Sequence, residues 1–255
     1  MIASFEEHVT FALLVSLLVA LSGCSNEDVS SETIATQRFY ASMSVSAEAP
    51  GLSRILVSFQ VDGPLGANVE LAGGEMLEAT VAGLTQTLIE DNRFFSIEYV
   101  TRFNTSSDAD PFRIRLTRAN GSVFDESVVS LRPEFTVTSP VPGQLASFRG
   151  DLSMEWAPAE PGETLTARFS SACRTMTGAL ALNVSTMILD DDGSELFDLG
   201  RLPAANDPTI DPSRACTLDV DFQRRATGML DPAFEAGGSI TSTQSREIED
   251  LTVLF

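Results

Sequence analysis

The chain has 255 residues and a formal net charge of −20, with 36 acidic side chains against 16 basic ones. This length is sufficient for one large hydrophobic core or two ordinary ones. A chain this acidic repels phosphate backbones, so nucleic acid is not an expected partner. All 16 basic residues are arginines, and His8 is the only histidine.

The first residues predict export from the cytoplasm. Residues 9–21 form an apolar run that only Thr10 and Ser16 interrupt. Such a run is too short to cross a bilayer as a helix, but it fits the apolar region of a secretory signal peptide. We therefore expect residues 1–23 to be a signal peptide, although Glu6 and Glu7 stand where basic residues are usual.

The residues Leu21-Ser22-Gly23-Cys24 follow this run and resemble the lipobox of bacterial lipoproteins. The resemblance implies that Cys24 becomes the lipidated first residue and that its acyl chains anchor the protein in the membrane of the cell envelope. Because Ser25 and not an aspartate follows the cysteine, the resemblance implies the outer membrane rather than the inner one. Residues 24–36 are mostly small or polar, so we expect a lipidated tether there.

The predicted mature chain lacks the side chains that several kinds of catalysis require. It has neither histidine nor lysine, so catalytic triads, Schiff bases and phosphate-binding P-loops are excluded. We predict no catalytic residue and no cofactor. The expected function is a non-enzymatic binding or structural module whose partner is an envelope protein or glycan. The alternatives are a secreted hydrolase that uses a carboxylate pair and a calcium-dependent carbohydrate-binding module.

From residue 38 onward, apolar and polar residues alternate in short runs that turn residues separate. These runs are Phe39–Val45, Ile55–Val61, Phe95–Tyr99, Phe112–Leu116, Leu180–Val184, Cys216–Phe222 and the terminal Ile248–Phe255. This pattern is typical of antiparallel β-sandwiches. Prolines cluster between positions 133 and 142, and we place a domain boundary there. The sequence thus predicts an all-β fold with two sandwiches, residues 37–133 and 134–255.

Residues 75–90 fit two structures. Leu77, Val81, Leu84 and Leu88 fall at helical spacing. The same stretch also fits two strands that join at Ala82-Gly83, and its threonines favour strands over a helix. We prefer the hairpin.

Residues 135–170 resemble immunoglobulin-like and fibronectin type III modules. A strand that ends at Pro140 is followed by an alternating strand that ends in Trp156-Ala157-Pro158. The resemblance implies that Trp156 packs between two sheets in the core of the second domain.

Two small clusters are candidate structural or metal sites. Without Cys24, the chain holds one cysteine pair, Cys173 and Cys216, which an oxidising compartment would join. Such a disulfide stabilises by roughly 4 kcal/mol in the chain-entropy model. Asp190, Asp192 and Glu195 are a weak calcium candidate, and the alternative is an exposed Asp-Gly turn.

Five arginines are the candidate anion-binding residues in this acidic chain: Arg102, Arg113, Arg115, Arg118 and Arg132. Guanidinium groups bind carboxylates and phosphates in a bidentate manner, so a shared arginine face suits a polyanion such as lipopolysaccharide. The alternative is pairing across strands with residues such as Glu98 or Glu126.

Overall fold

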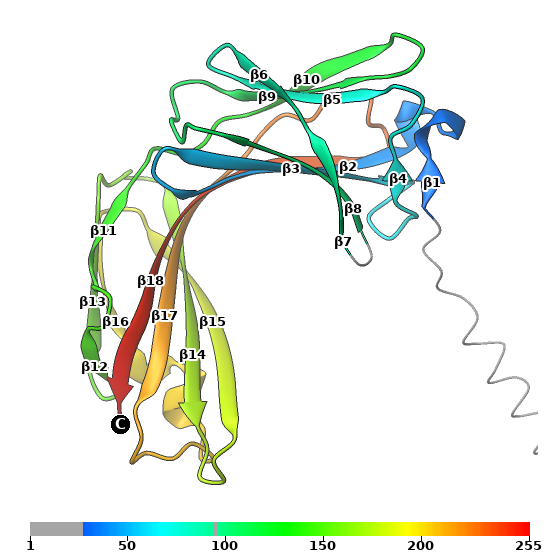
Figure 1. Cartoon of the computed structure of the whole chain (residues 1–255). Coiled ribbons are helices and arrows are strands. Elements are labelled where there is room, and N and C mark those ends of the chain that lie inside the picture. The colour runs from blue at the N-terminus through cyan, green and yellow to red at the C-terminus, as the bar shows by residue number, and fades with distance from the viewer. Residues whose placement is uncertain (1–27, 94–95) are drawn as a thin grey trace, which may run out of the picture.

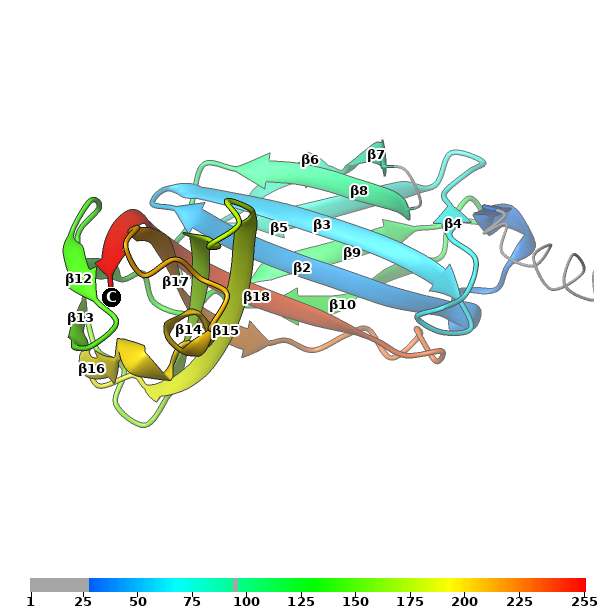
Figure 2. The ribbon, with the colours of Figure 1, turned by 90° about the horizontal axis from the view of Figure 1, so that it is seen from below.

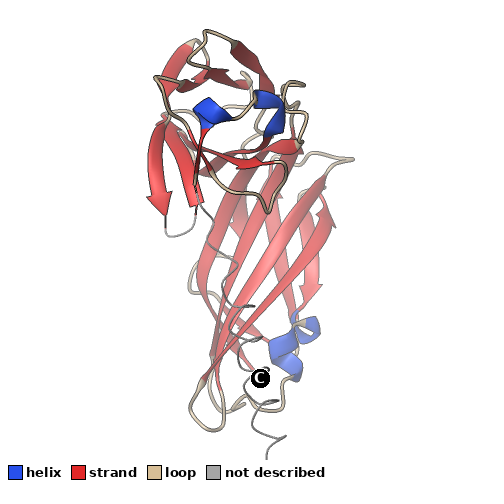
Figure 3. Cartoon of the chain, turned by 90° about the vertical axis from the view of Figure 1, so that its right-hand side faces the viewer, coloured by secondary structure: helices blue, strands red, loops and turns tan. Residues whose placement is uncertain are grey.

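The computed structural model describes residues 28–93 and 96–255. The predicted signal peptide, Cys24 and Phe95 lie outside these residues. The described chain consists of β-strands with four short 3-10 helices, so the predicted all-β fold is confirmed (Figure 3).

The strands form one large sheet and three smaller ones (Figure 1). The nine-stranded sheet has the order β15 (Leu180–Asp190), β14 (Thr164–Arg174), β17 (Cys216–Thr227), β18 (Gly238–Leu254), β2 (Phe39–Ala49), β3 (Leu52–Val61), β8 (Ser96–Phe103) and β7 (Ile89–Arg93), with β12 (Leu145–Ser147) beside β18. A four-stranded sheet contains β10 (Val123–Val129), β9 (Phe112–Thr117), β5 (Met76–Val81) and β6 (Leu84–Thr87). A three-stranded sheet contains β11 (Thr136–Ser139), β13 (Asp151–Ala157) and β16 (Ser194–Asp198). The fourth sheet pairs β1 (Val29–Ser30) with β4 (Val69–Glu70), and the 3-10 helices are η1 (Ser31–Thr33), η2 (Thr36–Arg38), η3 (Leu199–Arg201) and η4 (Pro203–Asn206).

Alternating side chains build two separate hydrophobic cores. In the first core, the apolar positions of β2, β3 and β8 face those of β5 and β9, as with Phe39, Phe59 and Phe112. In the second core, the three-stranded sheet packs on β14, β17 and β18. Trp156 is buried there, with its ring 6.1 Å from that of Phe222, as predicted.

One strand belongs to both cores. Ile240, near the start of β18, is buried in the first core, whereas Val253, near its end, is buried in the second. The start of β18 pairs in parallel with β2, and residues 241–253 pair with β17 on its other side (Figure 2). Phe234, in the segment before β18, also packs in the first core. The first sandwich therefore includes residues from near the end of the chain, such as Phe234 and Ile240. The predicted division at residue 133 assigns these residues to the second sandwich.

The four-stranded and three-stranded sheets cover the same face of the nine-stranded sheet. Ile240 and Ile248 are eight residues apart on β18 and point to the same side, and they pack against the first and the second core. Figure 1 shows the large sheet bent between the cores, with both smaller sheets on the outside of the bend. Within the described residues, the inside of the bend is a bare sheet face, and we call it the concave face.

Residues 76–87 form the predicted hairpin and not a helix. β5 and β6 pair in antiparallel register, with Val81 opposite Leu84. Ala82 and Gly83 form the turn with φ angles of 50° and 77°. Positive φ at both central residues is the signature of the type I′ hairpin turn.

Residues 28–36 differ from the expected free tether. Ser31, Ile34 and Thr36 are buried, and the Val29 amide donates to the Asn68 carbonyl at 2.8 Å. The segment is ordered because its backbone carbonyls and hydroxyls bind buried groups of the first sandwich. Only residues 24–27 of the predicted tether lie outside the described residues.

Candidate functional site

The structure does not bring the five predicted arginines together. Arg113 and Arg115 project from β9 on the exposed side of the four-stranded sheet, and Arg115 lies opposite Glu78. Arg102 lies on β8, in the nine-stranded sheet. Arg118 and Arg132 belong to two separate ion-pair networks. The expectation of one shared arginine face is therefore not met.

Arg102 instead faces an arginine that the sequence did not single out. Arg54 on β3 lies directly opposite Arg102 in the antiparallel β3–β8 pair. The Nε atom of Arg54 is buried without a hydrogen-bond partner, and neither guanidinium has an ion pair among the described residues. Like charges directly opposite each other destabilise a sheet, and buried polar atoms are normally paired. An anion between the two guanidinium groups would satisfy both.

A groove of about 430 Å³ opens beside this pair, where the chain passes from β6 to β7. Apolar side chains border the arginines: Ile89 on β7 is exposed, and Val100 lies opposite it on β8. Two acidic residues, Glu90 and Asp91, also line the groove, and the Glu90 carboxylate accepts a hydrogen bond of 2.8 Å from Asn92. The groove thus combines two guanidinium forks with an aliphatic wall, which suits an anionic group that carries apolar substituents.

The pairing register explains why sequence patterns missed Arg54. It precedes the alternating run that starts at Ile55, and nothing in that run indicates which strand will lie beside it. Only the pairing of β3 with β8 sets Arg54 against Arg102.

Arg118 binds the segment at the start of the described chain. Its guanidinium pairs with the buried Glu75 and donates to Thr36 Oγ1 at 2.7 Å and to the Ser31 carbonyl at 2.7 Å. It also lies over the ring of Phe39, 4.9 Å from the centroid. A hollow of about 380 Å³ adjoins this arginine, but the donors of Arg118 already bind protein groups. Arg118 holds residues 31–36 in place.

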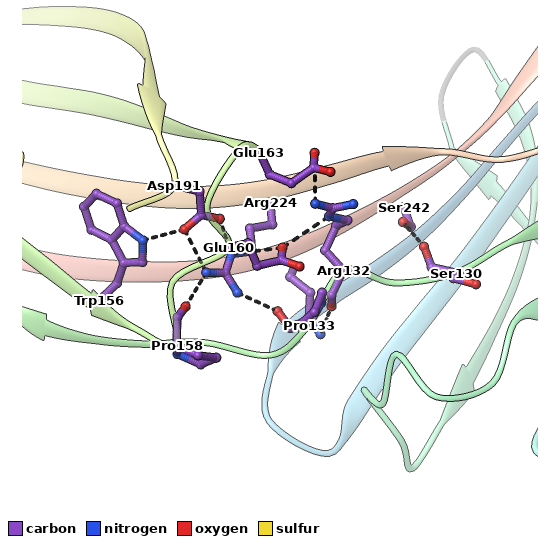
Figure 4. A network of polar contacts seen from close by, with 11 residues as sticks. Ser130, Arg132, Pro133, Trp156, Pro158, Glu160, Glu163, Asp191, Arg224 and Ser242 are labelled. Carbon is purple, nitrogen blue, oxygen red and sulfur yellow. Dashed lines mark hydrogen bonds and ion pairs between the residues drawn. The ribbon is translucent and has the colours of Figure 1, made fainter. Parts of the chain in front are cut away.

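A buried arginine joins the two sandwiches (Figure 4). The side chain of Arg224 on β17 is only 1% exposed and contacts both carboxylate oxygens of Asp191, at 2.6 and 2.9 Å. The same carboxylate accepts a 2.7 Å hydrogen bond from the indole nitrogen of Trp156. Arg224 also donates to the carbonyls of Pro158 and Pro133. One guanidinium therefore ties the second core to the segment that leaves the first sandwich.

Further contacts fix this connecting segment. Arg132 pairs with Glu160 at 3.3 Å and with Glu163 at 2.9 Å (Figure 4). Arg246 on β18 donates to the Phe135 carbonyl at 2.9 Å. Burial lowers the pKa of Arg246, and the nearby Glu134 carboxylate opposes that shift. We call Arg132, Asp191, Arg224 and Arg246 the joint network.

The calcium candidate is not assembled. Asp190 lies at the end of β15 opposite Thr164, and Asp192 Oδ1 accepts a hydrogen bond of 3.3 Å from the Ser194 amide. In the ranges that the structure describes, no three His, Cys, Asp or Glu side chains are placed to hold a metal ion. The segment is a bend between β15 and β16, which lie in different sheets. It is therefore not the exposed hairpin turn that was the alternative, and its middle aspartate, Asp191, is buried.

The predicted disulfide between Cys173 and Cys216 is confirmed, with a Cα–Cα distance of 4.4 Å. It joins directly opposite positions of the neighbouring strands β14 and β17, and both cysteines are buried. The bond therefore links strands within one sheet and is a structural element of the second core.

The sequence was also compared with known proteins. No family model matches the chain. No curated protein is significantly similar to it. Among the described residues, no helix has the length and apolar character to span a membrane.

Proposed function

We propose that the chain is a lipid-anchored binding module of a bacterial envelope, and that its concave face is a receptor for an anionic group. The observation that carries this proposal is the facing pair Arg54 and Arg102, which has no ion pair within the described part of the chain and lies beside a groove with an aliphatic wall. The predicted mature chain has no histidine or lysine for nucleophilic catalysis, which favours binding over a reaction.

The resemblance of the second sandwich to immunoglobulin-like modules forms part of the proposal. With β12 set aside, its first, second and fifth strands form one sheet, and its third, fourth, sixth and seventh strands lie in the other. This division and the buried Trp156 support the resemblance. The disulfide differs from that of immunoglobulin domains, because it does not bridge the two sheets.

The anchor and the binding site are tested separately. Metabolic labelling with a radioactive fatty acid should label the parent chain, and Cys24→Ser should remove both the label and the membrane association. Label that persists in Cys24→Ser would contradict the predicted lipid site.

Binding is tested with immobilised lipopolysaccharide as the polyanionic probe and the full chain in detergent. Arg54→Gln with Arg102→Gln should lower the affinity about tenfold or more, because hydrogen bonds to charged groups contribute about 1.5–3 kcal/mol each. Arg113→Gln with Arg115→Gln is the matched control, since it removes the same charge from the other sheet. Equal losses in both double variants would show that general charge, and not the groove, governs binding.

A further inference from the structure

The edge strand β15 exposes an apolar row on the concave face. Four of its side chains are largely exposed: Leu180 at 55%, Leu182 at 71%, Val184 at 55% and Ile188 at 74%. The intervening residues Ala181, Met187 and Leu189 face the second core. The row therefore lies outside the sandwich, although its alternation is the same as that of a buried strand.

The outer edge of β15 has no partner strand among the described residues, although η4 lies close to part of the strand. β15 is the terminal strand of the nine-stranded sheet and pairs with β14 over eleven residues without a register shift. Natural edge strands are protected by charges, prolines, bulges or short length. Residues 175–189 contain no charged side chain and no proline, in a chain with a net charge of −20. Such an edge is a template for a further strand.

The chemistry of the edge selects its occupant. In antiparallel pairing centred on Val184, two copies of β15 place Leu180 opposite Ile188 and Val184 opposite its own copy, so apolar side chains meet across the new strand pair. Thr186 is the one polar residue of the row, and it lies opposite Leu182. Repulsion between two acidic chains is weakest along this uncharged segment. We propose that β15 pairs with β15 of a second copy of this chain, and that the two nine-stranded sheets join into one.

The ends of the edge carry opposite charges. Asp190 closes β15, whereas Arg174 closes β14 at the other end, opposite Leu180 and on the same face. The Arg174 guanidinium donates to the Gly178 carbonyl at 3.2 Å. In the proposed register, Asp190 of the second copy lies opposite Gly178, within reach of this guanidinium. The two-fold axis repeats the ion pair, so antiparallel pairing is matched in charge as well as in apolar side chains.

The test uses the full chain in detergent, with Trp156 fluorescence as a check that each variant folds. Val184→Cys should give a disulfide-linked dimer under mild oxidation, because the two-fold axis brings the two thiols together. Val123→Cys is the matched control, since Val123 is an exposed valine on the edge strand β10. The parent chain, oxidised in the same way, measures any disulfide-linked dimer that forms through Cys24. Ile188→Glu should convert the parent dimer to monomer in sedimentation velocity.

The charge arrangement has its own test. Arg174→Glu and Asp190→Arg should each weaken the dimer several-fold, and the double variant should restore it. A parent chain that sediments as a monomer at micromolar concentration, with no more linked dimer for Val184→Cys than for Val123→Cys, would overturn the proposal. The proposal would also be overturned if, in the intact envelope, the Val184→Cys variant formed a disulfide with a different protein. A double variant that dimerises no better than either single variant would contradict the antiparallel register.

Discussion

Arg224 shows how one buried side chain determines the geometry of a joint. Its charge is removed from water, and the loss of solvation is offset by Asp191, two backbone carbonyls and the ring of Phe135, 4.7 Å away. Breaking a buried ion pair on one side leaves an uncompensated charge, which costs about 3–5 kcal/mol. We therefore expect Arg224→Met to lower the free energy of unfolding by about this amount, measured in urea by the fluorescence of Trp156.

The neighbouring Arg225 supplies the control, because it is exposed and contacts Gln223. Arg225→Met should change the free energy of unfolding by less than about 0.5 kcal/mol. A double variant of Arg224→Met and Asp191→Asn should lose less than the sum of the two single losses, as coupled neighbours do. Additive losses would contradict the coupling between Arg224 and Asp191.

At the scale of elements, the β5–β6 hairpin turns through a residue that is poorly suited to it. Ala82 holds a φ of 50°, and a left-handed conformation costs a non-glycine residue roughly 1–2 kcal/mol. Asn-Gly is the preferred pair for this turn, so Ala82→Asn should raise the free energy of unfolding by about 0.5–1 kcal/mol in urea titrations. Ala82→Val should lower it, since β-branched residues tolerate this region least. The opposite order would show that the turn does not hold this conformation in solution.

The β17–β18 pair carries a destabilising contact on the concave face. Glu247 lies opposite Asp221. Burial raises the pKa of Glu247, and the carboxylates of Asp221 and Glu249 raise it further. A raised pKa in the folded state means that the protonated form favours folding, so this contribution is present in acid and is lost as the pH rises through the folded-state pKa.

We expect Glu247→Gln to be more stable than the parent at pH 7, by roughly 0.2–1 kcal/mol and toward the lower value because Glu247 is exposed. The difference should vanish below the ordinary glutamate pKa of about 4.3. Urea unfolding at several pH values measures it. Asp62→Asn should show the opposite sign at pH 7, because Arg38 lowers the pKa of Asp62. A gain from Glu247→Gln that is independent of pH would contradict this account.

The individual strands were predictable from sequence, but their faces and partners were not. Alternation at Phe39–Val45 and at Leu180–Val184 looks the same, yet the first row is buried and the second is exposed. The predicted terminal strand began at Ile248, whereas β18 begins at Gly238. The added part is rich in serine and threonine and so lacks the apolar alternation, and the buried Ser242 hydroxyl donates to the Ser130 carbonyl at 2.6 Å. The Arg54–Arg102 pair depends on register, which a single sequence does not encode locally.

At the scale of the whole molecule, β18 makes two sandwiches into one mechanical unit. Its 17 residues span roughly 55 Å at about 3.3 Å per residue, which is long for a strand. The joint network adds contacts from Arg224 on β17 and Arg246 on β18 to the segment around Pro133. Because β18 contributes buried side chains to both cores, its detachment from one core would also expose part of the other. The bend between the sandwiches is therefore a fixed feature of the fold, and the concave face keeps its shape.

This coupling predicts that damage in one core is detected in the other. Ile55 is buried in the first core, whereas the only tryptophan, Trp156, reports from the second. Ile55→Ala should lower the free energy of unfolding by about 2–5 kcal/mol, and the full loss should appear in the Trp156 transition because both cores unfold together. Leu65→Ala, at a side chain that is 95% exposed, should leave that transition unchanged. If the sandwiches unfolded independently, Ile55→Ala would leave the Trp156 midpoint where it is in the parent chain and a separate, earlier transition would appear in far-ultraviolet circular dichroism.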